Sequence, residues 1–378
     1  MFAVDVLARA DGRKHGLRHF GRQAAGVVRR GLRGVAGAIA TPLVPADFLG
    51  LIDPLRFDAD LRGRIEAVSR ETATATTVTI RPGRGWIRPE AGQYIRIGLE
   101  VDGVRLWRAY SLTGPVDADT LSITVRAIPD GKVSNHILHR LRPGQFVYLD
   151  QATGDFTLPE PAPQRVLFLT AGSGITPVIG ILRNHPRTPA DVVVVHSAPT
   201  ADEMLFRDEL RAMDAAGRIR FVERITGRDG AEVRLPVHRI GDVVPDWRER
   251  HTWACGPTGM LDEAEEHWAA HALADRLHTE RFRTRLAAVG DGGEIDFSAS
   301  GTTVEADGST TILDAGEGAG VLMKSGCRMG ICFNCVVPLR DGSVRDLRTG
   351  EITTAIPEDP VLIQTCVSAA AGACQLDL

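Results

Sequence analysis

Three cysteines lie within nine residues of this 378-residue chain, in the stretch CRMGICFNC. Cys327, Cys332 and Cys335 follow the spacing Cys-x4-Cys-x2-Cys, and Cys366 comes later in the chain as a fourth sulfur ligand. This spacing is typical of plant-type [2Fe-2S] sites, in which one loop surrounds the cluster and a distant residue supplies the last thiolate. Structural zinc more often uses two paired knuckles, so zinc is the weaker alternative and disulfide bonds are weaker still. We therefore predict an iron–sulfur cluster held by these four residues.

The residues around this motif and the start of the chain indicate the setting of the cluster. Gly326 and Gly330 suit a loop that turns sharply, because glycine accepts a positive φ without steric cost. The first residues lack the pattern of a secretory signal. The longest apolar run near them, 35–44, is about half of the roughly 20 residues that a membrane-spanning helix requires. We expect a cytoplasmic protein whose cysteines are metal ligands or free thiols.

A glycine-rich stretch, TAGSGITP at 170–177, is a candidate nucleotide-binding loop because it follows an apolar strand and opens a helix. Gly172 and Gly174 would let the backbone approach a diphosphate, Thr176 would cap the helix, and Pro177 suits its first turn. The pattern G-x-G-x-x-P departs from the usual dinucleotide fingerprint and is weak alone. Its position strengthens it, since nucleotides bind at the carboxyl ends of parallel strands.

Cys255 ends another apolar strand and begins the stretch CGPTGM at 255–260. A lone free cysteine is usually a small buried hydrophobic residue. At the end of a strand that faces a nucleotide crevice, we favour a contact with a nicotinamide ring.

Two further motifs suggest a flavin site. In RAYS, Arg108 suits a phosphate, Tyr110 an aromatic ring, and Ser111 a hydrogen bond to a ring nitrogen. Taken alone, this stretch is better explained as a strand with a snorkelling arginine and a core tyrosine. In GKVSNHIL at 131–138, Ser134 resembles a helix N-cap, which would leave free N–H groups at the helix start as a second anion site. Together the two motifs predict a dinucleotide flavin, with FAD favoured over FMN.

The elements that would position these residues fall into three patterns. Short alternating runs over 62–158 predict an antiparallel barrel or sandwich. From about 165, apolar strands alternate with helical stretches, which predicts a parallel doubly wound sheet. The expected domains are 1–58, a basic amphipathic helical arm and linker; 59–160, an FAD-binding β-barrel; 161–286, an NAD(P)-binding α/β domain; and 287–378, an α+β ferredoxin-like β-grasp domain that holds the cluster.

Charge is unevenly spread along the chain. The net charge of −4 excludes a globally basic nucleic-acid-binding protein. Residues 1–55 carry eight Arg and Lys against four Asp, whereas from 292 onward twelve acidic residues face five basic ones. Apolar residues recur at helical spacing over 17–35, with arginines between them. The plain interpretation is an extension packed on the protein; the alternative is a peripheral contact of residues 1–50 with anionic lipid at the inner face of the plasma membrane.

A family resemblance joins these motifs. The chain resembles ferredoxin-NADP-reductase-like electron-transfer proteins with a fused C-terminal plant-type ferredoxin domain over about 62–378. The motifs that carry the resemblance occur in the family's order: RAYS, GKVSN, GDF, TAGSGITP, CGPTGM, HTERF and CRMGICFNC. The segment TPLVPADFLGLIDPL is also similar to actinobacterial reductases that serve membrane acyl-CoA desaturases.

The resemblance implies roles for individual residues. Tyr110 would lie on the isoalloxazine and Ser111 near its N5, with Glu280 and Phe282 at the flavin face. The implied catalytic residues are Ser111, Cys255 and Glu280. The implied cofactor-binding residues are Arg108, Tyr110, Ser111, Gly131, Lys132, Val133 and Ser134 for the flavin, Gly172, Ser173, Gly174, Thr176, Gly256 and Pro257 for the nucleotide, and Phe282.

Two features depart from the family pattern. The plant enzymes end in an aromatic residue that covers the flavin, whereas this chain continues into the cluster domain, and Phe282 would partly replace that residue. Pro199 stands where NADPH-using relatives often have an arginine, although Arg207 or Arg224 could compensate. The sequence therefore leaves NADH and NADPH open as the electron donor.

The predicted function is electron transfer. Hydride from NAD(P)H would pass to the flavin, which stores the electron pair and releases single electrons through the [2Fe-2S] cluster. The acceptor would be a desaturase, a hydroxylase or a ring dioxygenase with a basic patch opposite the acidic cluster domain. The alternatives are a general diaphorase with a small acceptor and a redox-sensing or regulatory subunit without sustained turnover.

Overall fold

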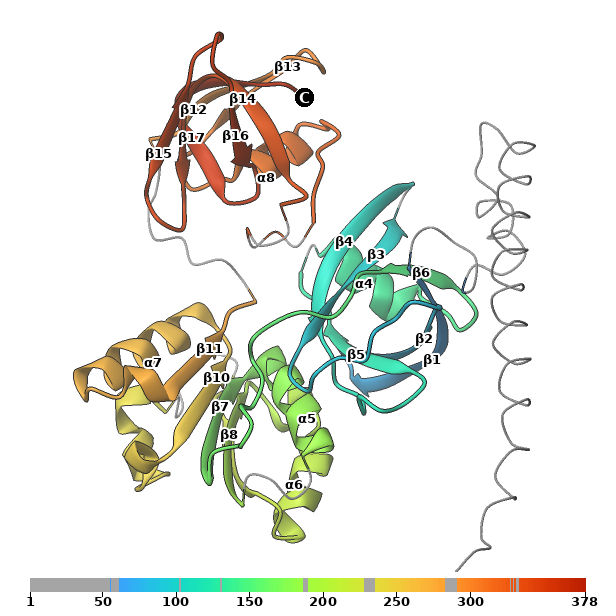
Figure 1. The fold of residues 1–378 in the computed structure, drawn as a ribbon, viewed down its shortest axis with the longest axis vertical. Coiled ribbons are helices and arrows are strands. Elements are labelled where there is room, and N and C mark those ends of the chain that lie inside the picture. The colour runs from blue at the N-terminus through green and yellow to red at the C-terminus, as the bar shows by residue number, and fades with distance from the viewer. Residues whose placement is uncertain are drawn as a thin grey trace, which may run out of the picture.

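The computed structural model describes residues 55, 61–101, 103–129, 131–185, 190–227, 235–282, 291–326, 328, 330 and 333–378. The amphipathic helix predicted near the N-terminus, and two of the predicted cluster ligands, Cys327 and Cys332, lie outside the described residues. Three sheets follow one another along the chain (Figure 1). Within the described ranges, no helix has the length and apolar character needed to cross a membrane.

The first sheet has six antiparallel strands in the order β4-β3-β6-β1-β2-β5, which confirms the predicted antiparallel barrel domain. Alternate side chains such as Val78 and Ile80 are fully buried, because successive residues of a strand point to opposite faces. Helix α4 (Lys132–His139) adds Val133 and Ile137 to this core. The strands are β1 (Arg62–Thr72), β2 (Ala75–Pro82), β3 (Tyr94–Val101), β4 (Val104–Ser111), β5 (Leu121–Arg126) and β6 (Phe146–Leu149).

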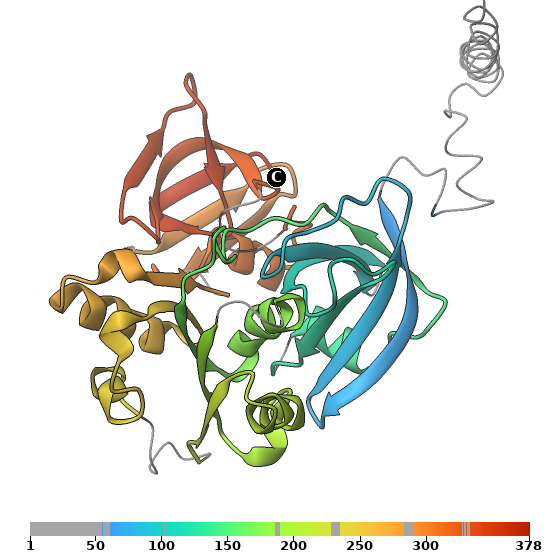
Figure 2. The same cartoon turned by 60° about the horizontal axis from the view of Figure 1, so that its bottom comes forward.

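The second sheet has five parallel strands in the order β11-β10-β7-β8-β9 and confirms the predicted doubly wound sheet. Its inner strands β7 and β8 contain continuous runs of buried apolar residues, as expected where helices cover both faces of a sheet (Figure 2). Helices α5 (Ile175–Asn184) and α6 (Arg207–Ala215) pack on one face, and α7 (Thr258–Ala270) packs on the other. The strands are β7 (Arg165–Ala171), β8 (Asp191–Ala198), β9 (Arg220–Ile225), β10 (His251–Cys255) and β11 (Leu277–Glu280).

Five short 3-10 helices also belong to this part of the chain. They are η1 (Gly172–Gly174), η2 (Ala201–Glu203), η3 (Val237–Asp242), η4 (Trp247–Glu249) and η5 (Ala274–Arg276).

The third sheet is mixed, with the order β13-β12-β17-β14-β15 and β16 paired to β14. Helix α8 (Ile312–Gly318) packs on it, and the Thr311 hydroxyl caps this helix by accepting a hydrogen bond from the Asp314 N–H at 3.1 Å. The strands are β12 (Gly293–Phe297), β13 (Thr302–Ala306), β14 (Val336–Asp346), β15 (Ile352–Ala355), β16 (Val361–Gln364) and β17 (Ser368–Leu376).

The prediction that Ser134 is the N-cap of α4 is wrong. The helix begins two residues earlier at Lys132, with Gly131 as its N-cap. The Ser134 hydroxyl donates back to the Gly131 carbonyl at 3.2 Å, and it occupies the space that a Cβ at Gly131 would need. Hydroxyls in a first helical turn commonly bond to a carbonyl three residues earlier, and this explains the displaced start.

Thr176 shows the same departure from its predicted capping role. Helix α5 begins at Ile175 with Gly174 as its N-cap, so Thr176 is the second helical residue. Its hydroxyl donates to the Ser173 carbonyl at 2.9 Å.

Candidate functional site

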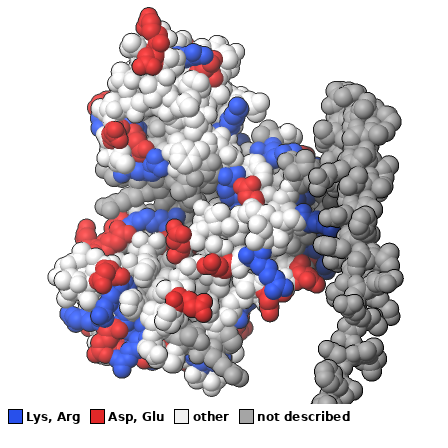
Figure 3. Space-filling model, in the orientation of Figure 1, with Lys and Arg blue, Asp and Glu red and all other residues white. Residues whose placement is uncertain are grey.

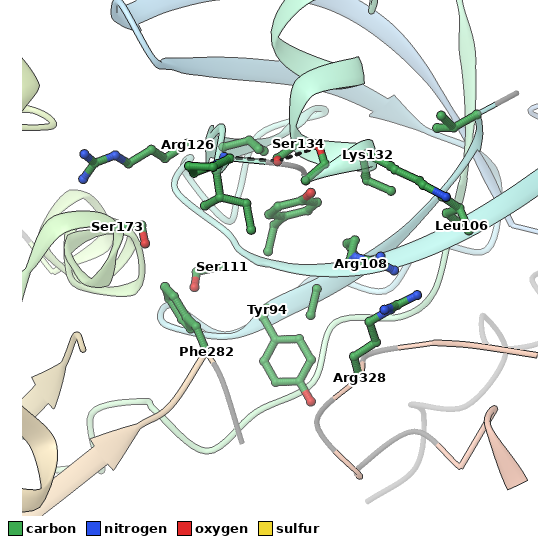
Figure 4. Close-up of a pocket in the computed structure, with 18 of the residues that line it drawn as sticks. Tyr94, Leu106, Arg108, Ser111, Arg126, Lys132, Ser134, Ser173, Phe282 and Arg328 are labelled. Atoms are coloured by element: carbon green, nitrogen blue, oxygen red, sulfur yellow. Dashed lines mark hydrogen bonds between the residues drawn. The ribbon is translucent and has the colours of Figure 1, made fainter. Parts of the chain in front are cut away.

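A cavity of about 860 Å³ lies where the three domains meet. Figure 4 shows Ser111, Ser173 and Phe282 toward one end of it and Arg108, Lys132 and Arg328 toward the other. All three domains therefore contribute to its wall. The lining residues with polar or aromatic side chains are Tyr94, Arg108, Tyr110, Ser111, Thr124, Arg126, Lys132, Ser134, Ser173, Thr176, Glu280, Arg281, Phe282, Glu317 and Arg328.

Strand β4 supplies the barrel side of this cavity. Arg108 donates to the Trp107 carbonyl at 2.7 Å, and Tyr110 packs against the barrel core, where burial raises the pKa of its phenol. Ser111 is the last residue of β4 and is 3% exposed. Its hydroxyl has no hydrogen-bond partner among the described residues although it is buried. An orphaned buried hydroxyl that lines a cavity is a candidate ligand contact.

Helix α4 closes the same side with its N-terminal turn. Gly131, Lys132, Val133 and Ser134 all line the cavity. The first N–H groups of a helix have no partner within it and, with the helix dipole, favour an anion. The Lys132 ammonium adds a positive charge at this position.

The parallel sheet contributes Glu280 from the end of β11. This side chain lines the cavity, and burial raises the pKa of its carboxyl to about 8. One of its oxygens, Oε2, lacks a hydrogen-bond partner among the described residues. Phe282 follows at the cavity wall, 37% exposed.

Cys255 lies opposite Glu280 on the neighbouring strand β10 but does not line the cavity. It is fully buried in the core beneath α5, and burial together with the Glu280 charge raises the pKa of its thiol well above the usual value. A contact between Cys255 and a nicotinamide ring stays a prediction.

Each glycine of the predicted nucleotide loops stands where a side chain would be unfavourable, for a different structural reason. Gly172 has a φ of +57°, which is costly for other residues. A Cβ at Gly174 would overlap the carbonyl of Cys255, and a Cβ at Gly256 would lie 2.6 Å from Met260 Cε. Pro257 is the N-cap residue of α7. Of these loops, only Ser173 and Thr176 reach the cavity wall.

Two of the predicted cluster ligands lie together in the third sheet. The Sγ atoms of Cys335 and Cys366 are 3.2 Å apart, too far for a disulfide bond and close enough for both to bind one metal ion at about 2.3 Å. Both residues are buried. The hydrogen bond between Cys335 and Cys366 is the main reason that the pKa of the Cys335 thiol is lowered to about 6. The two described cysteines therefore fit a metal centre bound by thiolates.

Gly330 lies in the cysteine motif, between Cys327 and Cys335 in the sequence. Its φ is +73°, as a sharp turn requires, and its carbonyl accepts hydrogen bonds from Arg348 at 3.0 Å and Gln364 at 2.9 Å. Arg348 is itself held by Asp346, with a shortest distance of 2.6 Å. Gly330 is thus held by residues at or just beyond the ends of β14 and β16.

Comparison with known proteins agrees with this arrangement. Family models match as an oxidoreductase FAD-binding domain at 63–158, an oxidoreductase NAD-binding domain at 168–266 and a 2Fe-2S iron-sulfur cluster binding domain at 295–371. An NADPH oxidoreductase of Mycobacterium tuberculosis (strain ATCC 25618 / H37Rv) is 49% identical over 356 residues, which cover 92% of each chain. This chain belongs to the FAD- and NAD-binding oxidoreductases that carry a 2Fe-2S domain. Its cofactors are FAD and a [2Fe-2S] cluster, and a pyridine nucleotide is its substrate.

Two further likenesses extend over most of this oxidoreductase. A stachydrine N-demethylase reductase subunit of Rhizobium meliloti (strain 1021) is 28% identical and covers 80% of this chain and 93% of its own. The solved structure of phthalate dioxygenase reductase has a TM-score of 0.59 at 21% identity and covers 85% of this chain and 98% of its own. The latter likeness concerns the fold, which has the same three-domain arrangement.

Several residues of this oxidoreductase line the cavity although the sequence did not point to them. Tyr94 and Arg126 come from the barrel, and Glu317, Leu322 and Arg328 come from the cluster domain. Arg328 is part of the motif CRMGICFNC and could have been noticed there as the one cation inside the cysteine loop. Glu317 and Leu322 carried no signal in the sequence, because only the docking of the third domain brings them to the cavity.

Proposed function

We propose that this oxidoreductase takes electrons from a nicotinamide nucleotide and delivers them through its cluster to a terminal oxygenase. The observation that carries this proposal is the single cavity lined by all three domains. When bound there, FAD accepts a hydride from the nucleotide and passes electrons singly to the [2Fe-2S] cluster. The chain supplies binding, orientation and proton control.

The barrel residues would bind and orient the flavin. Arg108, Lys132 and the first turn of α4 provide the positive end of the cavity, which suits the diphosphate. Tyr110 offers an aromatic face to the ring system, and Ser111 offers a hydroxyl that lacks another partner. Val133 and Ser134 complete this wall. A buried polar group without a partner favours a ligand that supplies one.

Glu280 would hold a proton at the other end of the cavity. Because burial raises the pKa of its carboxyl to about 8, the group is protonated at neutral pH and can donate a hydrogen bond. Cys255, opposite it in the sheet, stays a neutral thiol for the same reason of burial. We assign Ser111, Cys255 and Glu280 as the catalytic set, with Phe282 covering the flavin face.

The carboxyl edge of the parallel sheet would seat the nucleotide. Gly172, Ser173, Gly174, Thr176, Gly256 and Pro257 lie in the loops that follow β7 and β10, two adjacent strands of the sheet. Nucleotides bind in the crevice at this edge of such sheets.

We infer that NADPH is the preferred donor. The M. tuberculosis relative is an NADPH oxidoreductase. Arg224 lies opposite Ser197, near the carboxyl end of β8, and is our candidate for binding a 2′-phosphate. The test is kcat/KM for both nucleotides in the wild type and in Arg224→Gln. We expect at least a tenfold loss with NADPH alone; a wild type that prefers NADH would reject the assignment.

The acceptor class comes from the relatives. One is a stachydrine N-demethylase reductase subunit, and another, 28% identical and from Pseudomonas aeruginosa, is a glycine betaine monooxygenase reductase subunit. An acyl-CoA desaturase is the second candidate, which the similarity of the segment 41–55 favours. The region from 292 onward has a net charge of −7, from twelve acidic and five basic residues, although the face in Figure 3 shows both signs interspersed.

The experiment that tests the proposed function is reconstitution. The purified holoprotein and NADPH are mixed with an oxygenase component or with a desaturase in vesicles, and product formation is followed at about 0.05 and about 0.5 M salt. We expect turnover that depends on this chain and weakens at high salt. Reduction of small acceptors such as ferricyanide, with no turnover of any protein acceptor, would favour a diaphorase instead.

We propose that the domains span 59–160, 161–286 and 287–378, with residues 1–58 as an arm that precedes them.

We also propose that the first 50 residues contact anionic membranes. Sedimentation of the full chain and of a variant lacking residues 1–50 with anionic vesicles tests the arm. Equal sedimentation of the two proteins would exclude this contact.

A further inference from the structure

Two arginines from different domains face the same end of the cavity. Arg108 projects from the barrel and Arg328 from the cluster domain, and Figure 4 shows their side chains toward each other across the space. Their guanidinium groups repel one another; after burial, the charge of Arg328 is the next cause that lowers the pKa of Arg108. Like charges placed together in this way are stabilised when an anion lies between them.

The charges lining the whole cavity favour an anionic ligand. Five cationic side chains line it against the carboxylate of Glu317, while Glu280 keeps its proton at neutral pH. Three of the cations have acidic partners outside the cavity: Arg126 lies 4.0 Å from Glu203, Arg281 pairs with Asp262 and Glu265, and Arg328 pairs with Asp314. The cations at the positive end are Arg108, Lys132 and Arg328.

Arg328 is held in a fixed orientation. One guanidinium nitrogen lies 2.9 Å from Asp314 and the other contacts Glu317. Its backbone has a φ of +59°, a left-handed conformation that non-glycine residues rarely adopt and that is often found at functional positions. A guanidinium has five N–H donors in a fixed plane, a geometry that suits carboxylate and phosphate oxygens alike.

The cluster domain also offers apolar surface at this place. Val321, Leu322 and Met323 line the cavity, and Leu322 is 78% exposed. An exposed leucine beside a cation matches a ligand with an aromatic ring and a charged tail.

We propose that Arg328 binds the diphosphate of FAD from the cluster side, so that the cofactor joins the cluster domain to the barrel. This inference rests on the proposed placement of FAD in the cavity. It makes the affinity for FAD and the docking of the cluster domain interdependent, because the contact between Arg328 and the phosphate crosses the domain boundary. It also gives one arginine of the cysteine loop a role in flavin binding.

The test uses the full-length holoprotein and measures FAD release by the rise in flavin fluorescence on dilution. We expect Arg328→Gln to raise the Kd for FAD about tenfold or more and Arg328→Lys to raise it less, since bidentate charge-assisted contacts favour arginine. The matched control is Arg340→Gln, which removes an exposed arginine of the same domain that pairs with Asp377. If FAD joins the two domains, small-angle scattering should show that FAD-free wild type and Arg328→Gln are both more expanded than wild type with FAD bound.

The variant Arg108→Gln distinguishes an error about Arg328 from an error about the flavin site. If Arg108→Gln loses FAD while Arg328→Gln retains it with wild-type affinity, the inference about Arg328 is wrong and the proposed flavin site stands. If both variants retain FAD, the proposed site itself is wrong.

A second variant covers the case in which Arg328→Gln also loses the cluster. Asp314→Asn combined with Glu317→Gln removes both carboxylate partners and keeps the arginine. We expect FAD affinity to be unchanged or higher, because the positive end becomes more positive. A loss of FAD like that of Arg328→Gln would mean that the arginine acts only through its ion pairs.

Discussion

Cys255 and Glu280 lie directly opposite each other on the adjacent parallel strands β10 and β11. Neither side chain is charged at neutral pH, because burial raises the pKa of both groups and the Glu280 charge would raise that of Cys255 further. Thr170 continues this row on β7, and His196 follows on β8, where its Nδ1 lies 2.8 Å from the Thr170 hydroxyl. A row of neutral polar groups thus crosses the sheet below the cavity.

Glu280→Gln should change the pH dependence of flavin reduction. In the wild type the carboxyl carries its proton below pH about 8 and loses it above, so the rate with NADPH should fall as the pH rises through about 8. The variant keeps a hydrogen-bond donor but cannot titrate, so its profile should be flat in this range. Stopped-flow reduction from pH 6 to about 10 checks this. An unchanged fall in the variant would assign the titration to another group.

The same substitution should alter stability in a defined pH range. The ordinary carboxyl pKa is 4.5 and that of folded Glu280 is about 8, so the stabilisation from protonated Glu280 is complete below 4.5 and is lost as the pH rises through 8. Glu280→Gln should therefore be more stable than wild type at pH about 9, by about 3 kcal/mol or more, and similar at pH about 4. Thermal unfolding at both pH values measures this, and a variant that is less stable at the higher pH would contradict it.

Gly174→Ala should destabilise the parallel-sheet domain. The added Cβ would overlap the carbonyl of Cys255, and backbone cannot move away at low cost. We expect a loss of about 2 kcal/mol in the free energy of unfolding. The matched control is Gly259→Ala in α7, where a Cβ meets open space and helix propensity predicts a gain of up to about 1 kcal/mol. Equal effects of the two changes in urea unfolding would contradict the packing argument.

Ser111→Ala should slow flavin reduction without preventing FAD binding. The hydroxyl is buried beside the cavity without a protein partner, so its removal deletes a contact to the ligand and leaves the fold intact. We expect a fall of about a hundredfold in the rate of reduction by NADPH. Ser343→Ala, on the exposed face of β14, is the control and should behave as wild type. A rate within twofold of wild type for Ser111→Ala would remove this residue from the catalytic set.

The sequence correctly predicted the features that depend on residues close together in the chain. Alternating and continuous apolar runs specified the antiparallel and parallel sheets, because each pattern reflects how many faces of a strand are buried. The positive φ predicted at Gly330 is found, since a turn of this kind requires a glycine.

Contacts between distant segments were not predictable in this way. The sequence suggested only that Gly174 lets the backbone approach a diphosphate. In the structure, a Cβ at this position would overlap the carbonyl of Cys255, which lies far along the chain. Ser134 and Thr176 were expected to cap helices because their hydroxyls suit that position, yet the backbone starts each helix earlier. Arg328 reaches the cavity only because the cluster domain docks there, and no local pattern encodes that docking.

The central claim is that electrons pass from the nucleotide through the flavin to the cluster ligated by Cys335 and Cys366. The most direct measurement is an anaerobic single turnover, in which the holoprotein is mixed with NADPH while flavin absorption and the electron paramagnetic resonance signal of the reduced cluster are followed. The flavin should bleach first and the cluster signal should follow, whereas Cys366→Ser should show flavin bleaching without the wild-type cluster signal. Wild-type flavin that is reduced while its cluster stays oxidised would contradict the account.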